Sequence, residues 1–190
     1  MNYEQSIDYI HSIPKFRRPL GNANLEKLLT HLDNPQKKLK FIHIAGTNGK
    51  GSTAAMTAEI LKKSDFKTGL FTSPYLEVFN ERIRINGENI TDNDLAEYVT
   101  RVKAIMEKNN ALVSEFAFIT AVSFLYFYEK QCDIVVLEVG MGGKLDATNV
   151  IDSSLVSVIC KIGLDHTQYL GKNAVLCVTA AQPFHIRTMM

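Results

Sequence analysis

The nine residues AGTNGKGST at positions 45–53 follow directly on the apolar run FIHI at positions 41–44. An apolar run that leads into glycine, lysine and hydroxyl side chains is typical of a buried strand followed by a phosphate-binding loop. Glycines let backbone N–H groups converge on a polyphosphate, the Lys50 ammonium adds a mobile positive charge, and a following hydroxyl can reach a magnesium ion. The segment therefore predicts a nucleotide site. Its expected members are Gly46, Thr47, Asn48, Gly49, Lys50, Gly51, Ser52 and Thr53.

This segment departs in two places from the common pattern G-x-x-x-x-G-K-[ST]. Ile44 stands where the pattern has its first glycine, and Gly51 separates Lys50 from Ser52. A glycine-rich turn with a solvated lysine is the alternative that these residues leave open. The order of strand, loop, lysine and hydroxyl favours the nucleotide site. Residues 54–63 also predict a helix whose positive N-terminal end would face the phosphates.

The composition limits the classes of protein that need to be considered. The chain has 190 residues, 46% of them hydrophobic, with 21 basic and 20 acidic side chains and a formal charge of +1. This predicts one domain with one substantial core, and no overall basic charge for binding nucleic acid or a membrane surface. The three cysteines form no C-x-x-C pair, and the N-terminus lacks a basic region followed by an apolar one. We therefore expect a cytoplasmic protein.

Helix and strand patterns alternate along the chain. Helices are expected over residues 3–13, 25–32, 91–108 and from 114 or 115 through the aromatic-rich segment that follows. Strands are expected over residues 41–44, 67–72, 133–139 and 155–160, and residues 82–88 alternate like a small hairpin within a long loop. The last two strands are nearly continuous apolar runs, which is typical of parallel strands buried on both faces. The pattern predicts an α/β fold with a P-loop and a mostly parallel, doubly wound sheet flanked by helices.

Ligands of an open parallel sheet collect at the carboxyl ends of its strands. Besides the phosphate loop, those ends carry Ser73, Glu138 with the glycine-rich residues 140–143, and His166. A carboxylate in an apolar strand needs a cation or a donor, so magnesium is the expected partner of Glu138. A structural carboxylate bonded to backbone N–H groups is the alternative. His166 alone could be an ordinary turn histidine, and His43, within the first strand, is expected to be a core residue.

Four segments together resemble the folylpolyglutamate synthase and dihydrofolate synthase family, relatives of the Mur ligases. They are HIAGTNGKGST at 43–53, FTSPYL at 71–76 with FNERI at 79–83, EVGMGGKLDATN at 138–149, and GLDH at 163–166. Met141 and Lys144 depart from the leucine and arginine that are more usual in the third segment. The resemblance implies an ATP-dependent ligase. Such an enzyme phosphorylates a carboxylate of a folate, and the amine of glutamate then displaces phosphate to form an amide.

The same resemblance implies roles for individual residues. Lys50, Glu138 and His166 would be catalytic, and Ser73, Glu138 and His166 would bind Mg2+ beside the ATP. The implied substrate-binding residues are Ser73, Pro74, Tyr75, Arg82 and Asp146. The implied partners are reduced folate, L-glutamate and ATP, and the full-length family form is expected to be a monomer. The sequence leaves open whether dihydropteroate is a second substrate, as in a bifunctional enzyme.

The resemblance covers residues 1–171, which we interpret as an N-terminal ATP-binding ligase domain. Residues 172–190 lack the lysine-bearing helical segment of the family, and we expect the family's C-terminal glutamate-binding domain to be absent. We therefore expect a fragment that is inactive alone. An alternative of another class is a non-catalytic nucleotide-binding remnant. A third interpretation is an unrelated kinase or GTPase; for a GTPase, the chain lacks an N-K-x-D segment that would read guanine.

Overall fold

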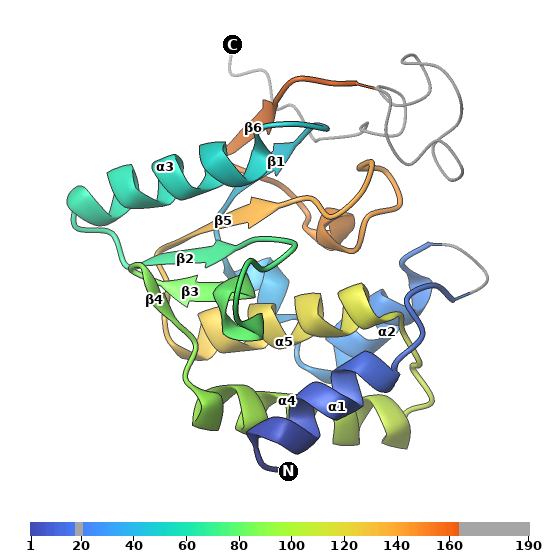
Figure 1. The fold of residues 1–190 in the computed structure, drawn as a ribbon. Coiled ribbons are helices and arrows are strands. Elements are labelled where there is room, and N and C mark those ends of the chain that lie inside the picture. Colours follow the sequence, from blue (N-terminus) through green and yellow to red (C-terminus); the bar gives the residue numbers. More distant parts are fainter. Residues whose placement is uncertain (18–20, 164–190) are drawn as a thin grey trace.

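The computed structural model describes residues 1–17 and 21–163. These residues form a six-stranded sheet with helices packed on it (Figure 1). The strand order is β4-β3-β2-β5-β1-β6. The strands are β1 (Phe41–Ala45), β2 (Thr68–Phe71), β3 (Ile83–Ile85), β4 (Glu88–Asn89), β5 (Ile134–Glu138) and β6 (Val156–Ile159). β2, β5, β1 and β6 are parallel, whereas β3 pairs antiparallel with both β2 and β4. The expected mostly parallel sheet is confirmed.

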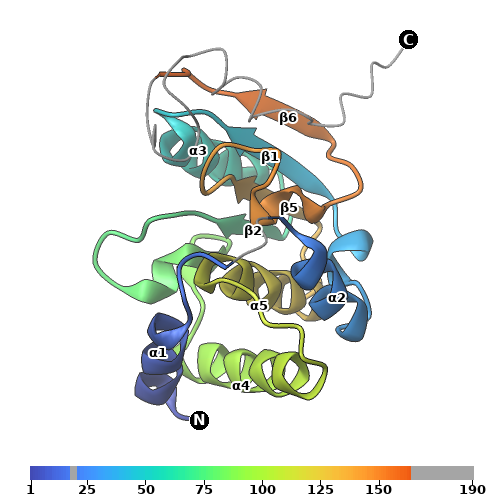
Figure 2. The same cartoon turned by 90° about the vertical axis from the view of Figure 1, so that its right-hand side faces the viewer.

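Helices cover both faces of this sheet. They are α1 (Tyr3–Ser12), α2 (Ala23–His31), α3 (Lys50–Lys63), α4 (Asp92–Lys108) and α5 (Glu115–Glu129). α3 lies on one face, and α5 lies on the other, between the sheet and α4 (Figure 2). Short 3-10 helices span Pro35–Lys38, Phe79–Arg82 and Ala147–Val150. The flanked α/β architecture predicted from the alternating pattern is therefore confirmed.

The main core lies between the sheet and α5. This helix is apolar on most faces because it packs against the sheet on one side and against other helices on the rest. Phe124 contacts Phe41 of β1 edge to face, with ring centroids 5.5 Å apart. The ring of Phe127 lies so close to Gly69 of β2 that a Cβ there would come within 2.8 Å of it. The aromatic residues of this helix thus belong largely to the core, as the sequence predicted.

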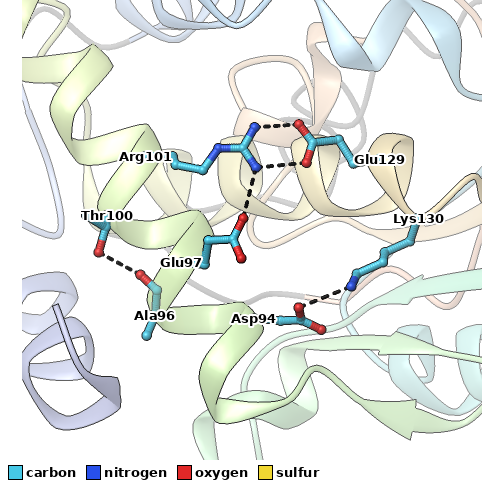
Figure 3. Close-up of polar contacts among 7 residues, drawn as sticks. All are labelled: Asp94, Ala96, Glu97, Thr100, Arg101, Glu129 and Lys130. Carbon is cyan, nitrogen blue, oxygen red and sulfur yellow. Dashed lines mark hydrogen bonds and ion pairs between the residues drawn. The ribbon is translucent and has the colours of Figure 1, made fainter.

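Ion pairs join α4 to the C-terminal end of α5 (Figure 3). The guanidinium of Arg101 donates to both carboxylate oxygens of Glu129, with Nη1 2.8 Å from Oε2, and to Glu97 one turn earlier at 3.4 Å. Lys130 donates to Asp94 at 3.1 Å. Bidentate arginine–carboxylate pairs are the stronger kind, although these lie near the surface. They fasten α4, which itself makes no sheet hydrogen bond, to the layer beneath it.

Local signals placed several element boundaries correctly. Thr91 caps α4 by accepting the backbone N–H of Asp94, and Ser114 caps α5 in the same way. The expected hairpin is formed by β3 and β4 around Asn86 and Gly87, both at positive φ. Within the described residues, no helix is long and apolar enough to cross a bilayer.

Two sequence expectations require correction. The helix expected from residue 54 begins at Lys50, because Gly49 adopts a left-handed conformation and accepts the N–H of Thr53 in the first turn. The strand expected to be buried on both faces, β6, lies at the edge of the sheet, where Val156 is 50% and Ile159 48% exposed. Among the described residues, α3 packs chiefly on β2, β5 and β1, and of β6 Val158 packs partly buried against the cluster that contains Ala54 of α3.

Candidate nucleotide and metal site

The loop between β1 and α3 has the backbone that its glycines predict. Gly46 has a φ of +135° and Gly49 a φ of +85°, values that side chains with a Cβ rarely adopt. Gly46 is also confined by its surroundings, because a Cβ there would lie 2.8 Å from Cβ of Cys160. The loop can therefore pass close to the end of β6 only with glycine at this position.

The first half of the loop is fastened to the chain beyond β6. The N–H groups of Thr47 and Asn48 donate to the carbonyl of Lys161 at 2.9 and 3.2 Å. The Thr47 hydroxyl donates to the carbonyl of Gly163 and accepts its N–H, at 3.1 and 3.0 Å. These contacts hold the first half of the loop against the segment that follows β6.

The second half of the loop offers unused donors. The N–H groups of Lys50, Gly51 and Ser52 open the 14-residue helix α3, and none of them has a hydrogen-bond acceptor within the described part of the chain. Such a helix start carries a partial positive charge and binds anions. The Lys50 ammonium folds back to donate to the Thr47 carbonyl at 3.3 Å, a long contact that a phosphate oxygen could replace.

Two further strand ends meet at this helix start. Glu138, the last residue of β5, is 3% exposed, and its Oε2 accepts the backbone N–H of Ser73, which follows β2, at 3.1 Å. A Cβ on Gly51 would lie 3.7 and 3.8 Å from the two carboxylate oxygens of Glu138. Burial raises the pKa of Glu138, and the Ser73 N–H and the Lys50 charge oppose that rise. The structure therefore brings together Lys50, Ser73 and Glu138, as the sequence predicted.

This donor set suits a magnesium ion. The pKa of Glu138 is raised because the Ser73 N–H and the Lys50 charge offset its desolvation only in part, and a bound cation would add positive charge. The Glu138 carboxylate and the Ser73 hydroxyl are oxygen ligands, which Mg2+ prefers, with water and phosphate completing its shell. Among residues 1–17 and 21–163, no three His, Cys, Asp or Glu side chains gather to hold a metal without such additional ligands. His166, the third expected ligand, lies outside the described residues.

Asp146 faces its own loop. Its Oδ2 accepts the N–H of Met141 at 2.8 Å, and its Oδ1 accepts the N–H and the hydroxyl of Thr148 at 2.9 and 2.6 Å. Burial raises the pKa of Asp146, whereas these hydrogen bonds lower it. The sequence implied contact with substrate at this position, which stays a prediction. The hydrogen bonds instead describe a carboxylate that orders the glycine-rich turn after β5.

The segment after Ser73 holds the remaining predicted substrate residues. Pro74 follows Ser73 through a cis peptide bond, and the Arg82 guanidinium carbon lies 5.2 Å from the Tyr75 ring centroid. Nε of Arg82 is buried and has no hydrogen-bond partner within the described residues. Burial is also what lowers the pKa of Arg82. These residues share one loop beside Ser73, and their contact with substrate stays a prediction.

Sequence reasoning missed the residues that support the site. Glu81 accepts the N–H groups of three residues in the loop that follows Tyr75, namely Leu76, Glu77 and Val78. His43, expected to be a core residue, is indeed buried, and its Nε2 lies 2.8 Å from the Thr148 hydroxyl. The D-x-T spacing of Asp146 and Thr148 is a recognisable local capping pattern and could have revealed their contact. Nothing local links either residue to His43.

Comparison with known proteins places the chain among ligases. The family model described as "Mur ligase middle domain" matches residues 44–176. Folylpolyglutamate synthase of Lacticaseibacillus casei is 43% identical over 176 residues, which is 90% of this chain and 41% of that protein. Dihydrofolate synthase/folylpolyglutamate synthase of Bacillus subtilis is 40% identical over 174 residues, 89% of this chain and 40% of that protein.

A solved structure of an FPGS-AMPPCP-folate complex superposes with a TM-score of 0.90 at 40% identity. The match covers 95% of this chain and 45% of that one. The fold of this chain therefore matches slightly less than half of that protein, and the chain spans about two fifths of the length of the curated relatives.

Proposed function

The chain belongs to the family of Mur ligase middle domains, and on that premise we propose that it is the ATP-binding part of a ligase that adds glutamate to a reduced folate. One observation carries this proposal. Lys50, the N–H groups at the start of α3 that have no acceptor among the described residues, and the buried Glu138 carboxylate that accepts the Ser73 N–H lie together. Relatives named folylpolyglutamate synthase, and a solved complex with AMPPCP and folate, support the choice of substrates.

The residues described would act mainly by positioning and by charge. The N–H groups of Lys50, Gly51 and Ser52 would bind phosphate oxygens, and the Lys50 ammonium would leave the Thr47 carbonyl to neutralise charge on the transferring phosphoryl group. Ser73 and Glu138 would hold Mg2+, with His166 as a further ligand. The bound ion would draw negative charge from the phosphates.

The chemistry proposed has two steps. A carboxylate oxygen of the folate attacks the γ-phosphorus of ATP, which gives an acyl phosphate and ADP. The amine of L-glutamate then attacks the acyl carbon, so that an amide forms, the carbon–oxygen bond to phosphate breaks and one proton leaves the nitrogen. Pro74, Tyr75, Arg82 and Asp146 would contact the folate.

A bifunctional enzyme that also accepts dihydropteroate is the second candidate, favoured by the Bacillus subtilis relative whose name joins both activities. A non-catalytic nucleotide-binding remnant is a third, favoured by the residues 172–190, which lack the family's lysine-bearing segment.

The proposed location is the cytoplasm, where folates and reduced thiols coexist. A monomer is proposed for the full-length form.

The experiment that tests the proposal separates binding from catalysis. Calorimetry would titrate ATP into the chain with and without Mg2+, and a ligation assay would supply ATP, tetrahydrofolate and glutamate. We expect ATP binding that Mg2+ strengthens, with little or no amide product from this chain alone. Failure to bind ATP under both conditions would contradict the nucleotide site. Amide formation at the rate of a complete synthase would contradict the expectation of an inactive fragment.

A further inference from the structure

We propose that His43 and Thr148 are positioning residues for the metal-binding carboxylate Glu138, acting through Asp146 and the turn that follows β5. The expected effect on ATP and Mg2+ binding rests on the proposed function, whereas the hydrogen bonds themselves are seen in the structure. His43, Thr148 and Asp146 form one buried chain of hydrogen bonds. It runs from His43, in the middle of β1, through Thr148, in the 3-10 helix after the glycine-rich turn, to Asp146.

The direction of each hydrogen bond follows from the groups involved. An ionised carboxylate can only accept, and Asp146 accepts from the N–H of Met141 and from the N–H and hydroxyl of Thr148. Because the Thr148 hydrogen points to Asp146, its oxygen must accept from the histidine. Nε2 of His43 therefore carries the hydrogen and donates it across 2.8 Å. The histidine is held neutral in this tautomer, since burial lowers its pKa to about 4.

The side chains of His43 and Thr148 are buried away from solvent. His43 and Thr148 are 1% and 0% exposed, and Asp146 is 7% exposed. His43 and Thr148 therefore cannot reach a reacting atom in solvent. They serve the site by what they hold in place, which is the backbone of residues 140 and 141.

That backbone follows directly on Glu138. Val139 is buried and donates its N–H to the Ile44 carbonyl at 2.9 Å, so the chain is fixed as it leaves β5. Gly140 then lies on the ring of Phe116, where a Cβ would approach within 2.6 Å. Asp146 holds the next N–H, that of Met141, from the loop side. Loss of this last support would let the turn shift and would change the direction of the Glu138 side chain.

β1 thereby supports both halves of the site. Its carboxyl end leads into the phosphate loop, and His43, two residues before Ala45, supports the loop that follows Glu138. β1 thus fixes the position of the phosphate-binding N–H groups relative to the Glu138 carboxylate.

The test compares threonine variants of the chain. Thr148→Val removes the hydroxyl with little change of shape, and Thr148→Ser retains it. Thr68→Val is the matched control, since Thr68 is also buried but its hydroxyl bonds the Phe66 carbonyl at the opposite, amino end of β2. Amide hydrogen exchange of Met141, measured by NMR, reports on the turn, and calorimetry with ATP and Mg2+ reports on the site.

We expect Thr148→Val to speed exchange of the Met141 amide about tenfold and to weaken Mg2+-dependent ATP binding several-fold, as loss of one buried hydrogen bond allows. Thr148→Ser should restore both values, and Thr68→Val should change neither even if it melts at a lower temperature. Unchanged Met141 exchange in Thr148→Val would overturn the inference. So would faster exchange with unchanged ATP binding.

A second variant keeps the test decisive if Thr148→Val does not fold. His43→Phe keeps a ring in the core and removes the donor to Thr148, so it should move both values in the same direction by a smaller amount. Equal exchange in His43→Phe and the parent would refute the role of His43. If the parent chain itself does not bind ATP, the proposed function fails, while the exchange measurement still decides whether the network orders the turn.

Discussion

The backbone N–H of Ser73 donates to Oε2 of Glu138 at 3.1 Å, which joins the ends of β2 and β5 directly beside the start of α3. This contact holds a carboxylate that has little else to compensate its charge. Desolvation therefore dominates over the Ser73 N–H and Lys50, and the pKa of Glu138 is raised. The buried Glu138 carboxylate therefore destabilises the folded chain when no cation is bound, and a bound cation would offset this effect.

Glu138→Gln should therefore stabilise the metal-free chain at pH 7 by about 1 kcal/mol, because a neutral amide is cheaper to bury than a carboxylate. A raised pKa in the folded state means that the parent gains stability as the pH falls towards the ordinary glutamate value, and the variant should lack that gain. Urea unfolding at pH 7 and pH 5 measures both effects. The exposed Glu59→Gln on α3 is the control, and a Glu138→Gln variant less stable than the parent at pH 7 would contradict the account.

Gly46→Ala should destabilise the chain by about 2 kcal/mol or more, since the added Cβ meets both a left-handed backbone and the Cys160 side chain. Gly21 is a matched control, because it has a similar positive φ of +129° but, among the described residues, no atom within 4 Å of an added Cβ. Gly21→Ala should cost only the backbone strain, about 1 kcal/mol. Denaturant midpoints of the two variants decide the matter, and equal losses would mean that the Cys160 contact is unimportant.

His43 gives the fold a pH dependence of its own. Its pKa falls from 6.5 to about 4 on burial, so the unfolded chain binds a proton that the folded chain does not. The stability that neutral His43 contributes is fully present above pH 6.5 and is lost as the pH falls towards 4, by up to roughly 3 kcal/mol. His43→Phe should remove this part of the pH dependence. Thermal melting between pH 7 and pH 4 measures it, and parallel curves for variant and parent would contradict the prediction.

Arg101 should matter less than its geometry suggests. It binds Glu129 through two hydrogen bonds, but its side chain is 41% exposed, so Arg101→Ala should cost below about 1 kcal/mol at neutral pH. The pKa of Glu129 is lowered chiefly by its hydrogen bond to Arg101, so the stability from this pair is present above pH 4.5 and lost as the pH falls below it. The difference between Arg101→Ala and the parent should shrink as the pH falls below 4.5. A loss as large at pH 3 as at pH 7 would assign the effect to packing.

The sequence carried those features that depend on local chemistry. The glycines at 46 and 49 predicted the phosphate loop, the caps at Thr91 and Ser114 predicted two helix starts, and the acid at Glu138 predicted a strand end at the site. Features that depend on contacts between residues far apart in the chain could not be predicted from the sequence. The apolar run of β6 did not reveal that the strand lies at a partly uncovered edge, and the contact between His43 and Thr148 joins positions 105 residues apart. Composition likewise could not reveal that Asp146 turns into its own loop, since the same residue on the loop surface would leave the same pattern.

The measurement that tests the central claim most directly is calorimetry of ATP and Mg2+ binding to the parent, Lys50→Ala and Lys63→Ala. The two lysines lie at opposite ends of α3, and the contact that the Lys63 ammonium makes within the described residues is an exposed ion pair with Glu59. If the start of this helix binds the phosphates, Lys50→Ala should weaken binding by about tenfold or more, as loss of a charged hydrogen bond does, and Lys63→Ala should leave it unchanged. Equal affinities for the parent and Lys50→Ala would contradict the account.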